Sequence, residues 1–482
     1  MTTAACPARA LAPERRTHYP AILHVAPFVC VDALAVFLAA ALVVLTRYWM
    51  GGHFELAFYL RMSVVTGLFL ISYAVIGLYP GLALHPVVEL QYISHGTTLT
   101  VLLLGTLTFF QRDAEAYSRS ILLVSWVLII PAVCAARAML RRLLGRTSWW
   151  GEHVVILGAG RAGRSVADFL HSRPGTGLRV AAILDDDPEK LHLARNSAPF
   201  VAPLSAAPSL AEQSGIRYAI IAMPDARGRE LSAIVEGHAS RYHHVFIIPD
   251  LFGVSSLGVD ARDLGGLLGV RVSHRLLHFF PSLFKRVFDV TAACLGSLVL
   301  SPVFVTAYVL VRLTSSGPGF FAHSRIGLDG APFTAWKFRT MLDGSSEVLR
   351  RHLDSHPEHR REWESGHKLK SDPRVTWIGR LLRRTSLDEL PQLWNVIRGE
   401  MSLVGPRPIV AEEVEKYGPR YSLYCKVRPG LTGMWQVSGR NNTTYEERVQ
   451  FDEYYVRNWS VWLDIYILIR TLKVVLTAEG AY

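Results

Sequence analysis

The feature that most constrains this chain is a set of four apolar stretches within its first 150 residues, at about 26–45, 62–79, 93–110 and 120–136. Each stretch reaches or approaches the roughly 17–25 residues that a helix needs to cross the core of a bilayer. A cleavable signal peptide is the alternative for the first stretch, but Asp32 lies inside it and no small-residue cleavage site follows. We therefore predict a four-helix transmembrane domain over residues 1–148.

Charge and composition agree with a membrane protein that carries a basic soluble part. Half of the residues are hydrophobic, 19% are charged, and the formal net charge is +11. These values argue against a disordered chain and against an ordinary cytosolic enzyme. The basic excess suits nucleic acid, anionic lipid or phosphate-bearing substrates alike. Arginines precede the first stretch and follow the fourth, so the positive-inside rule places both ends of this domain in the cytoplasm. These residues are Arg9, Arg15, Arg16, Arg137, Arg141, Arg142 and Arg146.

The next segment, residues 149–280, alternates short β-rich runs with helical ones, which indicates a parallel α/β sheet of Rossmann-like type. The predicted strands lie at 153–157, 179–184, 218–223 and 244–248. The first turn contains Gly158, Gly160 and Gly163, and the second strand ends at Asp185. This spacing is typical of a loop that holds a pyrophosphate, with an acid for the ribose. The alternative, which we favour, is a domain that keeps the fold without a dinucleotide.

Residues 281–482 begin with an apolar run at 290–311 that is long enough for a fifth crossing. However, Ser301 and Pro302 lie at its middle, where a proline removes a helix hydrogen bond. Basic residues flank both ends of the run, so we favour a re-entrant helix at about 285–312 that enters and leaves through one leaflet. The predicted fold is a multi-domain membrane protein with a four-helix transmembrane bundle, an α/β middle domain and a mainly α carboxy-terminal domain.

Two adjacent acids, Asp388 and Glu389, carry the strongest chemical signal in this last domain. With Pro391 in the first turn of a helix, Asp388 is predicted to be its N-cap and Glu389 its first residue. One interpretation makes the pair only a cap and a favourable acid. In the other, the helix terminus holds one carboxylate ionised as a nucleophile or metal ligand while its neighbour positions Mg²⁺. Nearby basic residues could neutralise phosphoryl charge. They are Lys337, Arg339, Arg383, Arg384 and Arg407.

Four motifs in the last third of the chain occur together. They are Lys337-Phe-Arg339-Thr-Met341, Ser386-Leu-Asp-Glu-Leu-Pro-Gln392, Gly405-Pro-Arg-Pro408 and Pro429-Gly-Leu-Thr-Gly433. This combination resembles the bacterial sugar transferases, monotopic-type phosphoglycosyl transferases that load a sugar 1-phosphate onto a polyprenyl phosphate. The resemblance is strongest over residues 284–482, and the amino-terminal two thirds resemble the large polytopic members of that family. The segment Met434–Ser438 and the two residues after it resemble the galactose-type members.

The resemblance implies a two-step reaction. Asp388 would attack the β-phosphate of a UDP-sugar, release UMP and hold the phosphosugar until undecaprenyl phosphate takes it. Glu389 would act beside it with Mg²⁺, or with Mn²⁺ in its place, so that both acids are candidate metal ligands. NAD is not expected as a cofactor. Positions that match the family's other site residues are Arg325, Lys337, Arg383, Arg407 and Asp464.

The resemblance also implies a setting, which is the initiating step of O-antigen, capsule or exopolysaccharide synthesis. The expected partners are a UDP-sugar, undecaprenyl phosphate, the lipid bilayer, a second copy in a homodimer and later glycosyltransferases of the pathway, with no nucleic acid. The expected location is the bacterial inner membrane, with several crossings and with the catalytic domain and both termini in the cytoplasm. UDP-galactose is the preferred donor, and UDP-glucose or a UDP-N-acetylhexosamine is the alternative.

Two functions of other classes remain as rivals. One is an NAD-dependent nucleotide-sugar dehydratase or epimerase that uses the glycine loop, and the other is a non-enzymatic assembly protein of a polysaccharide machine. Two further segments are interpreted as surface. Residues 462–476 carry Asp464, Arg470 and Lys473 among apolar residues, as an amphipathic helix in the membrane plane would. Four histidines in a charged helical segment are interpreted as solvated side chains rather than metal ligands. They are His352, His356, His359 and His367.

Overall fold

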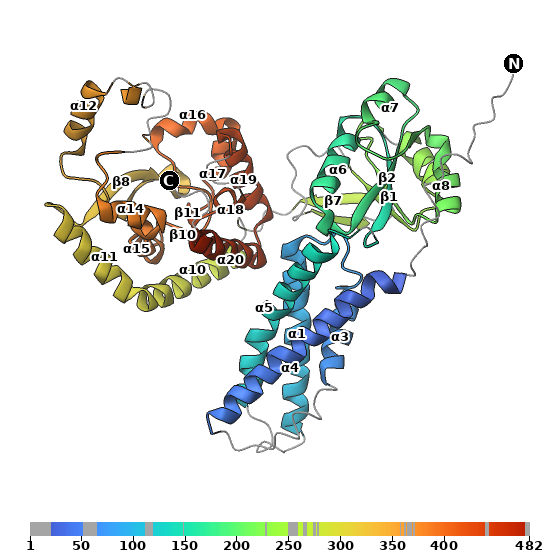
Figure 1. Ribbon diagram of the computed structural model, residues 1–482, viewed down its shortest axis with the longest axis horizontal. Coiled ribbons are helices and arrows are strands. Elements are labelled where there is room, and N and C mark those ends of the chain that lie inside the picture. The colour runs from blue at the N-terminus through green and yellow to red at the C-terminus, as the bar shows by residue number, and fades with distance from the viewer. Residues whose placement is uncertain are drawn as a thin grey trace. The chain divides into compact units, whose positions relative to one another are not determined.

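The computed structural model describes residues 21–51, 65–110, 119–147, 149–226, 229–248, 259–263, 268–272, 276, 279–356, 358–360, 363, 369, 372–438 and 443–477. The chain divides into two compact units, Met1–Phe252 and Gly253–Tyr482 (Figure 1). The first unit includes both the amino-terminal helices and the following sheet. Phe28 and Leu144 of the helices form one buried cluster with Trp150, which lies just before the first strand. The boundary expected at residue 148 therefore lies inside one unit.

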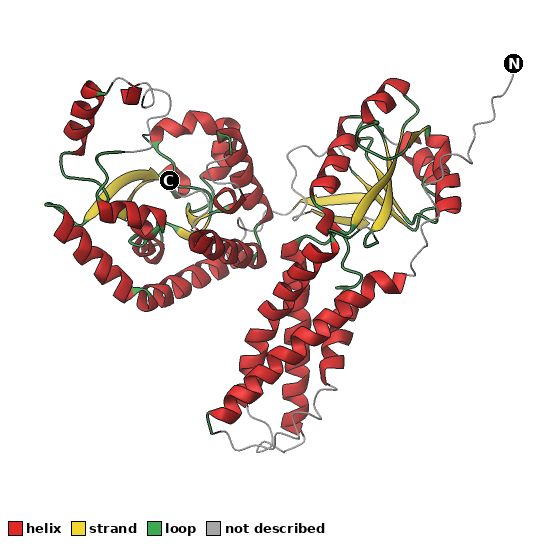
Figure 2. Cartoon of the chain, in the orientation of Figure 1, coloured by secondary structure: helices red, strands yellow, loops and turns green. Residues whose placement is uncertain are grey.

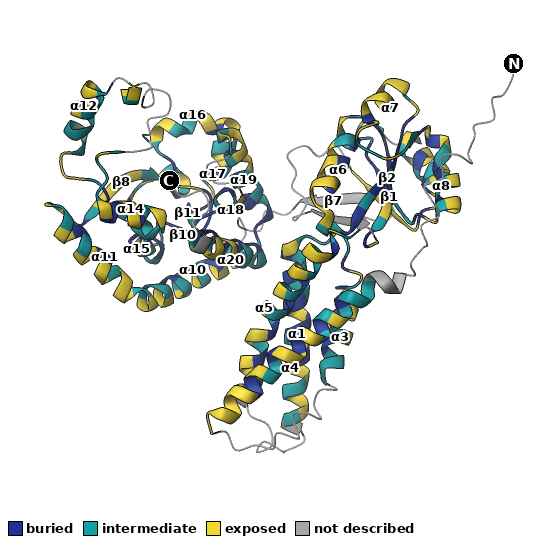
Figure 3. Ribbon diagram, in the orientation of Figure 1, coloured by how far each residue is buried: buried dark blue, intermediate teal, exposed yellow. Residues whose placement is uncertain are grey.

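Four helices occupy the positions of the four apolar stretches, although residues 62–64 of the second stretch lie outside the described part. They are α1 (Ala21–Trp49), α3 (Val65–Ile76), α4 (Pro86–Phe110) and α5 (Arg119–Leu144). The helices pack around a shared core that includes Val36, Tyr73, Ile93 and Ile129. Large apolar side chains on their outer faces stay exposed (Figure 3). Among the described helices of this unit, α1 and α5 are long and apolar enough to cross a membrane.

A buried ion pair joins the two longest of these helices. Arg137 on α5 donates to both carboxylate oxygens of Asp32 on α1, with Nε–Oδ1 and Nη2–Oδ2 distances of 2.8 Å. Its Nη1 atom lies 2.8 Å from Oε1 of Glu89 on α4, and the Tyr79 hydroxyl donates to Asp32 at 2.7 Å. Both Arg137 and Asp32 are fully buried. Arg137 is thus a packing residue of the helices rather than one of the free basic residues that flank them.

The α/β part of the first unit is a five-stranded parallel sheet in the order β3-β2-β1-β4-β5 (Figure 2). Its strands are β1 (Glu152–Leu157), β2 (Leu178–Leu184), β3 (Val201–Ala202), β4 (Tyr218–Ile221) and β5 (His244–Ile247). Its helices include α6 (Arg161–Ser172), α7 (Pro188–Ala194), α8 (Ala207–Ser214) and α9 (Arg229–Ala233). The four predicted strands are confirmed. The two-residue β3 was missed because it is too short to give a periodic signal.

The second unit is mainly helical, and its described residues form three small two-stranded sheets. Its strands are β6 (Val259–Asp263), β7 (Leu268–Val272), β8 (Phe320–Ile326), β9 (Pro332–Phe338), β10 (Ser402–Val404) and β11 (Gly430–Thr432). Its helices are α10 (Phe279–Val299), α11 (Ser301–Thr314), α12 (Ser345–Ser355), α14 (Trp377–Arg384), α15 (Gln392–Arg398), α16 (Val414–Tyr417), α17 (Tyr421–Tyr424), α18 (Met434–Ser438), α19 (Tyr445–Asn458) and α20 (Val461–Thr477).

The long apolar run of this unit is a broken helix. The axes of α10 and α11 differ by 64° at a break of one residue, Leu300. Pro302 is the second residue of α11, where the missing N–H group needs no partner. The Ser301 hydroxyl donates to the Leu298 carbonyl at 2.7 Å across the break. The predicted position of the break is therefore confirmed, and the bent pair has the form of either a broken span or a re-entrant loop.

Candidate active site

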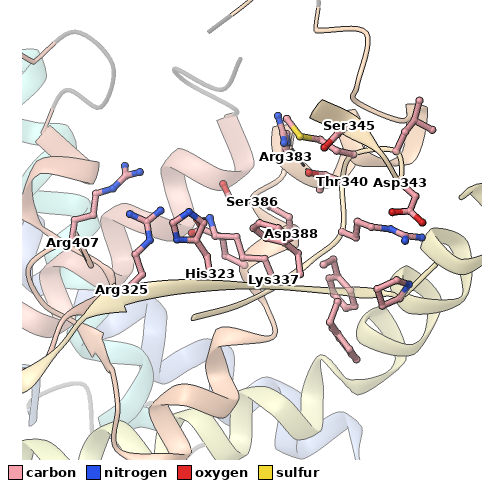
Figure 4. A pocket seen from close by; sticks show the side chains of 18 of the residues that line it. His323, Arg325, Lys337, Thr340, Asp343, Ser345, Arg383, Ser386, Asp388 and Arg407 are labelled. Carbon is pink, nitrogen blue, oxygen red and sulfur yellow. Dashed lines mark hydrogen bonds and ion pairs between the residues drawn. The ribbon is translucent and has the colours of Figure 1, made fainter. Parts of the chain in front are cut away.

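The second unit holds a pocket of about 670 Å³, which is a volume typical of small-molecule sites. Most of the site residues that the sequence predicts line it together (Figure 4). These are Arg325, Lys337, Arg339, Arg383, Asp388, Glu389 and Arg407. Arg384 is exposed and is not among the lining residues. Residues that are up to 82 positions apart in the sequence thus form one site.

The β8–β9 hairpin explains how three of these cations reach the pocket. The strands are antiparallel, with Phe321 opposite Lys337 and Arg325 opposite Phe333. Alternate residues of a strand point to one face, so Arg325 and Lys337 share a face with His323 between them. Arg339 is two residues beyond Lys337 and therefore lies on the same face. Its backbone N–H donates to the Gly319 carbonyl at 3.0 Å.

Arg339 is buried but only partly satisfied. Its Nη2 atom donates to the Ser315 carbonyl at 2.8 Å, and its Nε and Nη1 atoms have no acceptor among the described residues. A buried guanidinium with unused donors loses free energy unless an anion supplies the acceptors. Arg339 therefore supports a pocket that takes a phosphate group.

The end of α14 and the turn after it place Arg383 and Asp388. Arg383 lies in the last turn of α14, and its Nε atom donates to Thr340 Oγ1 at 2.9 Å. Ser386 has a left-handed backbone with φ of +56° and reverses the chain. Leu387–Glu389 then form a single 3-10 turn before α15 begins at Gln392.

This geometry corrects the predicted role of Asp388 as a helix N-cap. The 3-10 turn is capped by Ser386, and Pro391 occupies the N-cap position of α15, so Asp388 lies inside the turn that precedes the helix. The predicted start of the helix was wrong because proline is common both just before a helix and in its first turn, so Pro391 does not fix where the helix begins. The predicted helix stop is confirmed, since Gly399 caps α15 with a left-handed backbone.

Burial, rather than a positive helix field, dominates the electrostatics of Asp388. Burial and the neighbouring Glu389 carboxylate raise the pKa of Asp388 to about 6, and the cations Lys337 and Arg383 oppose this shift. At neutral pH the carboxylate is still largely ionised, and it is more basic than an ordinary aspartate. A desolvated, ionised carboxylate with cations on either side is suited to nucleophilic attack on phosphorus.

Glu389 is held differently from its neighbour. Lys337 Nζ lies 2.5 Å from Glu389 Oε1, and among the described residues Asp388 has no ion pair. Both acids line the pocket together with Asp343. Carboxylate oxygens beside a phosphate site are the ligands that Mg²⁺ prefers, so the donor set here fits a magnesium ion held by Asp388 and Glu389.

Arg325 and Arg407 form the basic end of the pocket (Figure 4). Burial and the charge of Arg407 lower the pKa of Arg325, and its acidic partner Glu413 is 3.9 Å away. Arg407 lies over the ring of Trp435, with 5.2 Å between the guanidinium carbon and the ring centroid. Two adjacent cations with little carboxylate compensation favour a multiply charged anion such as a diphosphate.

A close contact between two backbone segments holds Arg407 in place. β10 and β11 are parallel and pair Ser402 with Gly430 and Val404 with Thr432. A Cβ atom added at Gly430 would lie 2.1 Å from the backbone nitrogen of Gly405. Two of the sequence motifs therefore contain glycine because their backbones touch, which sets the path of the chain that leads to Arg407.

Asp464 does not reach the pocket, contrary to the role that the family resemblance implied. It is 1% exposed on α20, and its Oδ2 atom lies 2.9 Å from Lys285 Nζ on α10. The Tyr455 hydroxyl and the Trp459 indole N–H also donate to it, at 2.8 and 3.0 Å. Asp464 is thus the centre of a buried network that joins α10, α19 and α20. Ser301 and Pro302 at the helix break also lie outside the lining.

Sequence reasoning did not single out His323 and Asp343, which line the pocket, and it gave no site role to two further lining residues of the 434–440 segment, Trp435 and Gln436. The Gln436 Oε1 atom is buried without a partner among the described residues, so it is free to accept a hydrogen bond from a bound substrate. The period-two pattern of β8 is the signal that could have placed His323 beside Arg325.

The glycine loop of the α/β part is held by close contacts within the loop and by Asp185. Asp185 accepts a hydrogen bond from the Ala159 backbone N–H at 2.7 Å and another from Asp187 at 3.0 Å. A Cβ atom at Gly163 would lie 1.8 Å from the Gly158 carbonyl oxygen, so this glycine serves close packing of the helix on the strand. Asp185 therefore binds the loop that it was expected to assist through one oxygen, and its other oxygen is used by the Asp187 backbone.

The apolar helices and the pocket of acids and buried cations define a membrane-associated enzyme whose site suits phosphate-bearing substrates. Comparison with known families agrees with this class. Residues 280–478 match the bacterial sugar transferase family, and residues 74–249 match a family described as a CoA-binding domain.

Relatives of known name cover most of the chain. The UDP-galactose-lipid carrier transferase of Erwinia amylovora is 39% identical over 76% of this chain and 76% of its own length. The UDP-glucose:undecaprenyl-phosphate glucose-1-phosphate transferase of Escherichia coli is 31% identical over 82% of this chain and 83% of its own length. The exopolysaccharide production protein ExoY of Sinorhizobium fredii is 48% identical over 41% of this chain and 88% of its own length. The chain belongs to the bacterial sugar transferase family and is a phosphoglycosyl transferase.

Proposed function

We propose that this protein transfers galactose 1-phosphate from UDP-galactose to undecaprenyl phosphate and releases UMP. The observation that carries the proposal is Asp388, a desolvated carboxylate in a pocket lined by Lys337, Arg383 and Arg407. The names of the relatives support a nucleotide sugar as donor and a lipid carrier as acceptor. The galactose identity rests on the Erwinia amylovora relative, which is more similar to this chain than the Escherichia coli relative is. UDP-glucose or a UDP-N-acetylhexosamine is the alternative donor.

The proposed reaction has two steps at one phosphorus atom. A carboxylate oxygen of Asp388 attacks the β-phosphorus of the UDP-sugar, and the bond to the bridging oxygen breaks so that UMP leaves with the electron pair. An oxygen of undecaprenyl phosphate then attacks the same phosphorus and displaces Asp388 as a free carboxylate. The products are UMP and undecaprenyl-diphosphate-galactose. One acid thus serves as both nucleophile and leaving group.

The other pocket residues supply charge and position. Arg325 and Arg407 suit the diphosphate, while Arg383 and Arg339 offer donors to the phosphoryl oxygens as charge develops. Lys337 holds Glu389 beside the nucleophile. When bound to Asp388 and Glu389, Mg²⁺ or Mn²⁺ would supply additional positive charge to the phosphoryl group.

The proposed setting is the bacterial inner membrane, with both termini and the catalytic unit in the cytoplasm. The four amino-terminal helices would form the transmembrane bundle, and α10 with α11 would enter and return through one leaflet. The 64° bend between α10 and α11 supports a re-entrant helix. That arrangement would keep the pocket at the height of a lipid phosphate. A homodimer, later glycosyltransferases as partners, and a role in starting O-antigen, capsule or exopolysaccharide synthesis complete the proposal.

The test is a set of labelling reactions with the full-length protein in nanodiscs and Mg²⁺. With undecaprenyl phosphate present, label from UDP-[¹⁴C]galactose should pass to the lipid extract faster than label from UDP-glucose or UDP-N-acetylglucosamine. Without the lipid, label should stay on the protein and UMP should be released once per site. Asp388→Asn keeps the shape of the side chain and should abolish both signals.

The outcomes separate the parts of the proposal. Faster transfer from another UDP-sugar would overturn the galactose assignment and leave the reaction type intact. If the wild-type protein releases UMP only when undecaprenyl phosphate is present, a direct displacement replaces the covalent route. If Asp388→Asn retains normal transfer, Asp388 is not the nucleophile.

A further inference from the structure

Three histidines converge at the end of α12 and in the short segment after it. One ring nitrogen from each of His352, His356 and His359 lies within 4.8 Å of the other two. The ring centroids are 4.4 to 5.4 Å apart. His367 lies outside the described residues. The interpretation of these histidines as separate solvated side chains does not account for such convergence, because isolated surface rings have no reason to gather.

Hydrogen bonds define which ring nitrogens are free to act as ligands. His356 Nδ1 lies 3.1 Å from the carbonyl oxygen of His352, so Nδ1 carries the hydrogen and Nε2 keeps its lone pair. A backbone carbonyl that fixes the second nitrogen is the usual support of a metal-binding histidine. His352 Nε2 faces His359 Nδ1 at 2.8 Å. In that pair one nitrogen donates to the other, and a metal ion would replace the shared hydrogen.

We propose that His352, His356 and His359 bind a zinc ion. Zn²⁺ accepts imidazole nitrogens at about 2.0–2.1 Å in tetrahedral geometry, which puts neighbouring ligand atoms roughly 3.3 Å apart. The facing nitrogens of His352 and His359 therefore need to separate by only about half an ångström. Three protein ligands leave the fourth position to water, since the histidines are partly exposed. An all-imidazole site does not suit Mg²⁺, which prefers oxygen, so the ion differs from that of the acid pair.

Because of where the site lies, the ion would have a structural role. α12 belongs to an excursion of the chain that leaves and returns at the edge of the pocket. The Leu342 N–H donates to the Arg374 carbonyl at 2.8 Å, and Met341 pairs with Val375. Asp343 and Ser345, at the start of the excursion, line the pocket. A zinc ion that joins α12 to the segment after it would restrain this excursion, because metal binding fixes its ligands relative to one another.

The experiment uses the untagged full-length protein in nanodiscs after removal of metal by chelation. It is titrated with Zn²⁺ against a chromophoric indicator in excess Mg²⁺, and with Co²⁺ while visible absorption is recorded. The cluster variant carries His352→Gln, His356→Gln and His359→Gln. The matched control replaces three histidines of the first unit by glutamine; they are His171, His192 and His238. Asp388→Asn shows whether the catalytic acids contribute.

The wild-type protein, the control and Asp388→Asn should each bind one zinc ion per chain, and Co²⁺ should give the intense visible bands of a tetrahedral site. The cluster variant should bind zinc at least tenfold more weakly and give no such bands. The single variant His359→Gln should also bind more weakly, and it serves if the triple variant does not fold. Equal zinc binding by wild type and the cluster variants would overturn the proposal, as would loss of zinc in Asp388→Asn.

Discussion

The Lys337 ammonium group pairs with Glu389 at 2.5 Å, whereas the adjacent Asp388 carboxylate has no ion pair among the described residues. Two neighbouring acids with the same charge are therefore in different states. Glu389 is neutralised by a partner, whereas the partly buried Asp388 has no direct ion pair and feels Lys337 and Arg383 only as neighbouring charges. Since an ion-paired oxygen is a poorer nucleophile than a free one, this asymmetry favours Asp388 as the attacking carboxylate of the proposed reaction, with Glu389 in a supporting role.

The first prediction concerns pH. Because the pKa of Asp388 is raised to about 6 and the nucleophile must be ionised, kcat/KM should fall tenfold per unit as the pH drops below about 6. Glu389→Gln removes the charge that, after burial, contributes most to this shift. The acidic limb of the residual activity should then move to lower pH. Rates of UMP release measured from pH 4.5 to 8 test this, and an identical midpoint in both proteins would contradict it.

Arg383 and its neighbour Arg384 offer a matched pair for testing charge stabilisation. Arg383 lines the pocket and donates to Thr340, while Arg384 is exposed. Arg383→Ala should lower kcat/KM by about 10²–10³-fold, the usual effect of removing one donor from a developing charge. Arg384→Ala should change it less than twofold. Equal losses in the two variants would mean that general basicity, rather than a defined contact, is what matters.

The buried pair of Lys285 and Asp464 should act on stability. Asp464→Asn removes the nearer of the two carboxylates that pair with the buried Lys285 and leaves only Asp289, at 3.3 Å. Breaking a buried ion pair typically costs about 3–5 kcal/mol of unfolding free energy, and the remaining partner should keep this loss at the lower end. Glu446→Gln, which breaks the exposed pair with Arg420, should cost less than about 1 kcal/mol. Thermal unfolding measures both, and KM for the UDP-sugar should be unchanged in protein that remains folded. A raised KM with normal stability would instead indicate that Asp464 takes part in substrate binding.

Membrane topology distinguishes a re-entrant helix from a broken crossing. Leu283 on α10 and Leu313 on α11 are exposed and flank the bend. In a cysteine-free background, Leu283→Cys and Leu313→Cys should react with an impermeant maleimide from the same, cytoplasmic side. Sealed vesicles of both orientations give the comparison. Labelling of the two positions from opposite sides would rule out the re-entrant arrangement.

The catalytic unit should work without the first 278 residues. Every pocket residue lies after Phe279, where α10 begins, and the ExoY relative matches only 41% of this chain over 88% of its own length. A fragment that starts at Phe279 should therefore keep kcat/KM within tenfold of the full chain in detergent. If the fragment is folded by circular dichroism and has no turnover, the first unit contributes to the site.

The sequence predicted the pocket better than it predicted the fold around it. The short motifs contain Lys337, Asp388 and Arg407, the family resemblance added Arg325, and all four residues line the pocket. The 3-10 turn was missed since Ser386 adopts a left-handed backbone without being glycine. Period-two alternation can locate β8 and β9 in the sequence. Tertiary packing, however, decides which face of the hairpin lines the pocket.

Long-range pairs explain the remaining errors. The family resemblance implied a site role for Asp464, and nothing in the sequence indicated its partner Lys285, which is 179 residues away. In the same way, the three clustered histidines are spaced i, i+4 and i+7, but α12 ends at Ser355, so their convergence depends on the path of the chain after this helix. The sequence can indicate that a charged residue belongs to a site. It does not show when a partner far along the chain binds that residue elsewhere.

The Asp32–Arg137 pair also affects how the protein can be made. Both residues are fully buried, one on each of the two helices long enough to cross a membrane, and 105 residues of chain separate them. A lone charge at the centre of a helix costs about 2.5–3.5 kcal/mol during insertion from the translocon. α1 therefore carries an unneutralised carboxylate until α5 has been synthesised. The amino-terminal helices are expected to settle in the bilayer as a group, late in translation, rather than one after another.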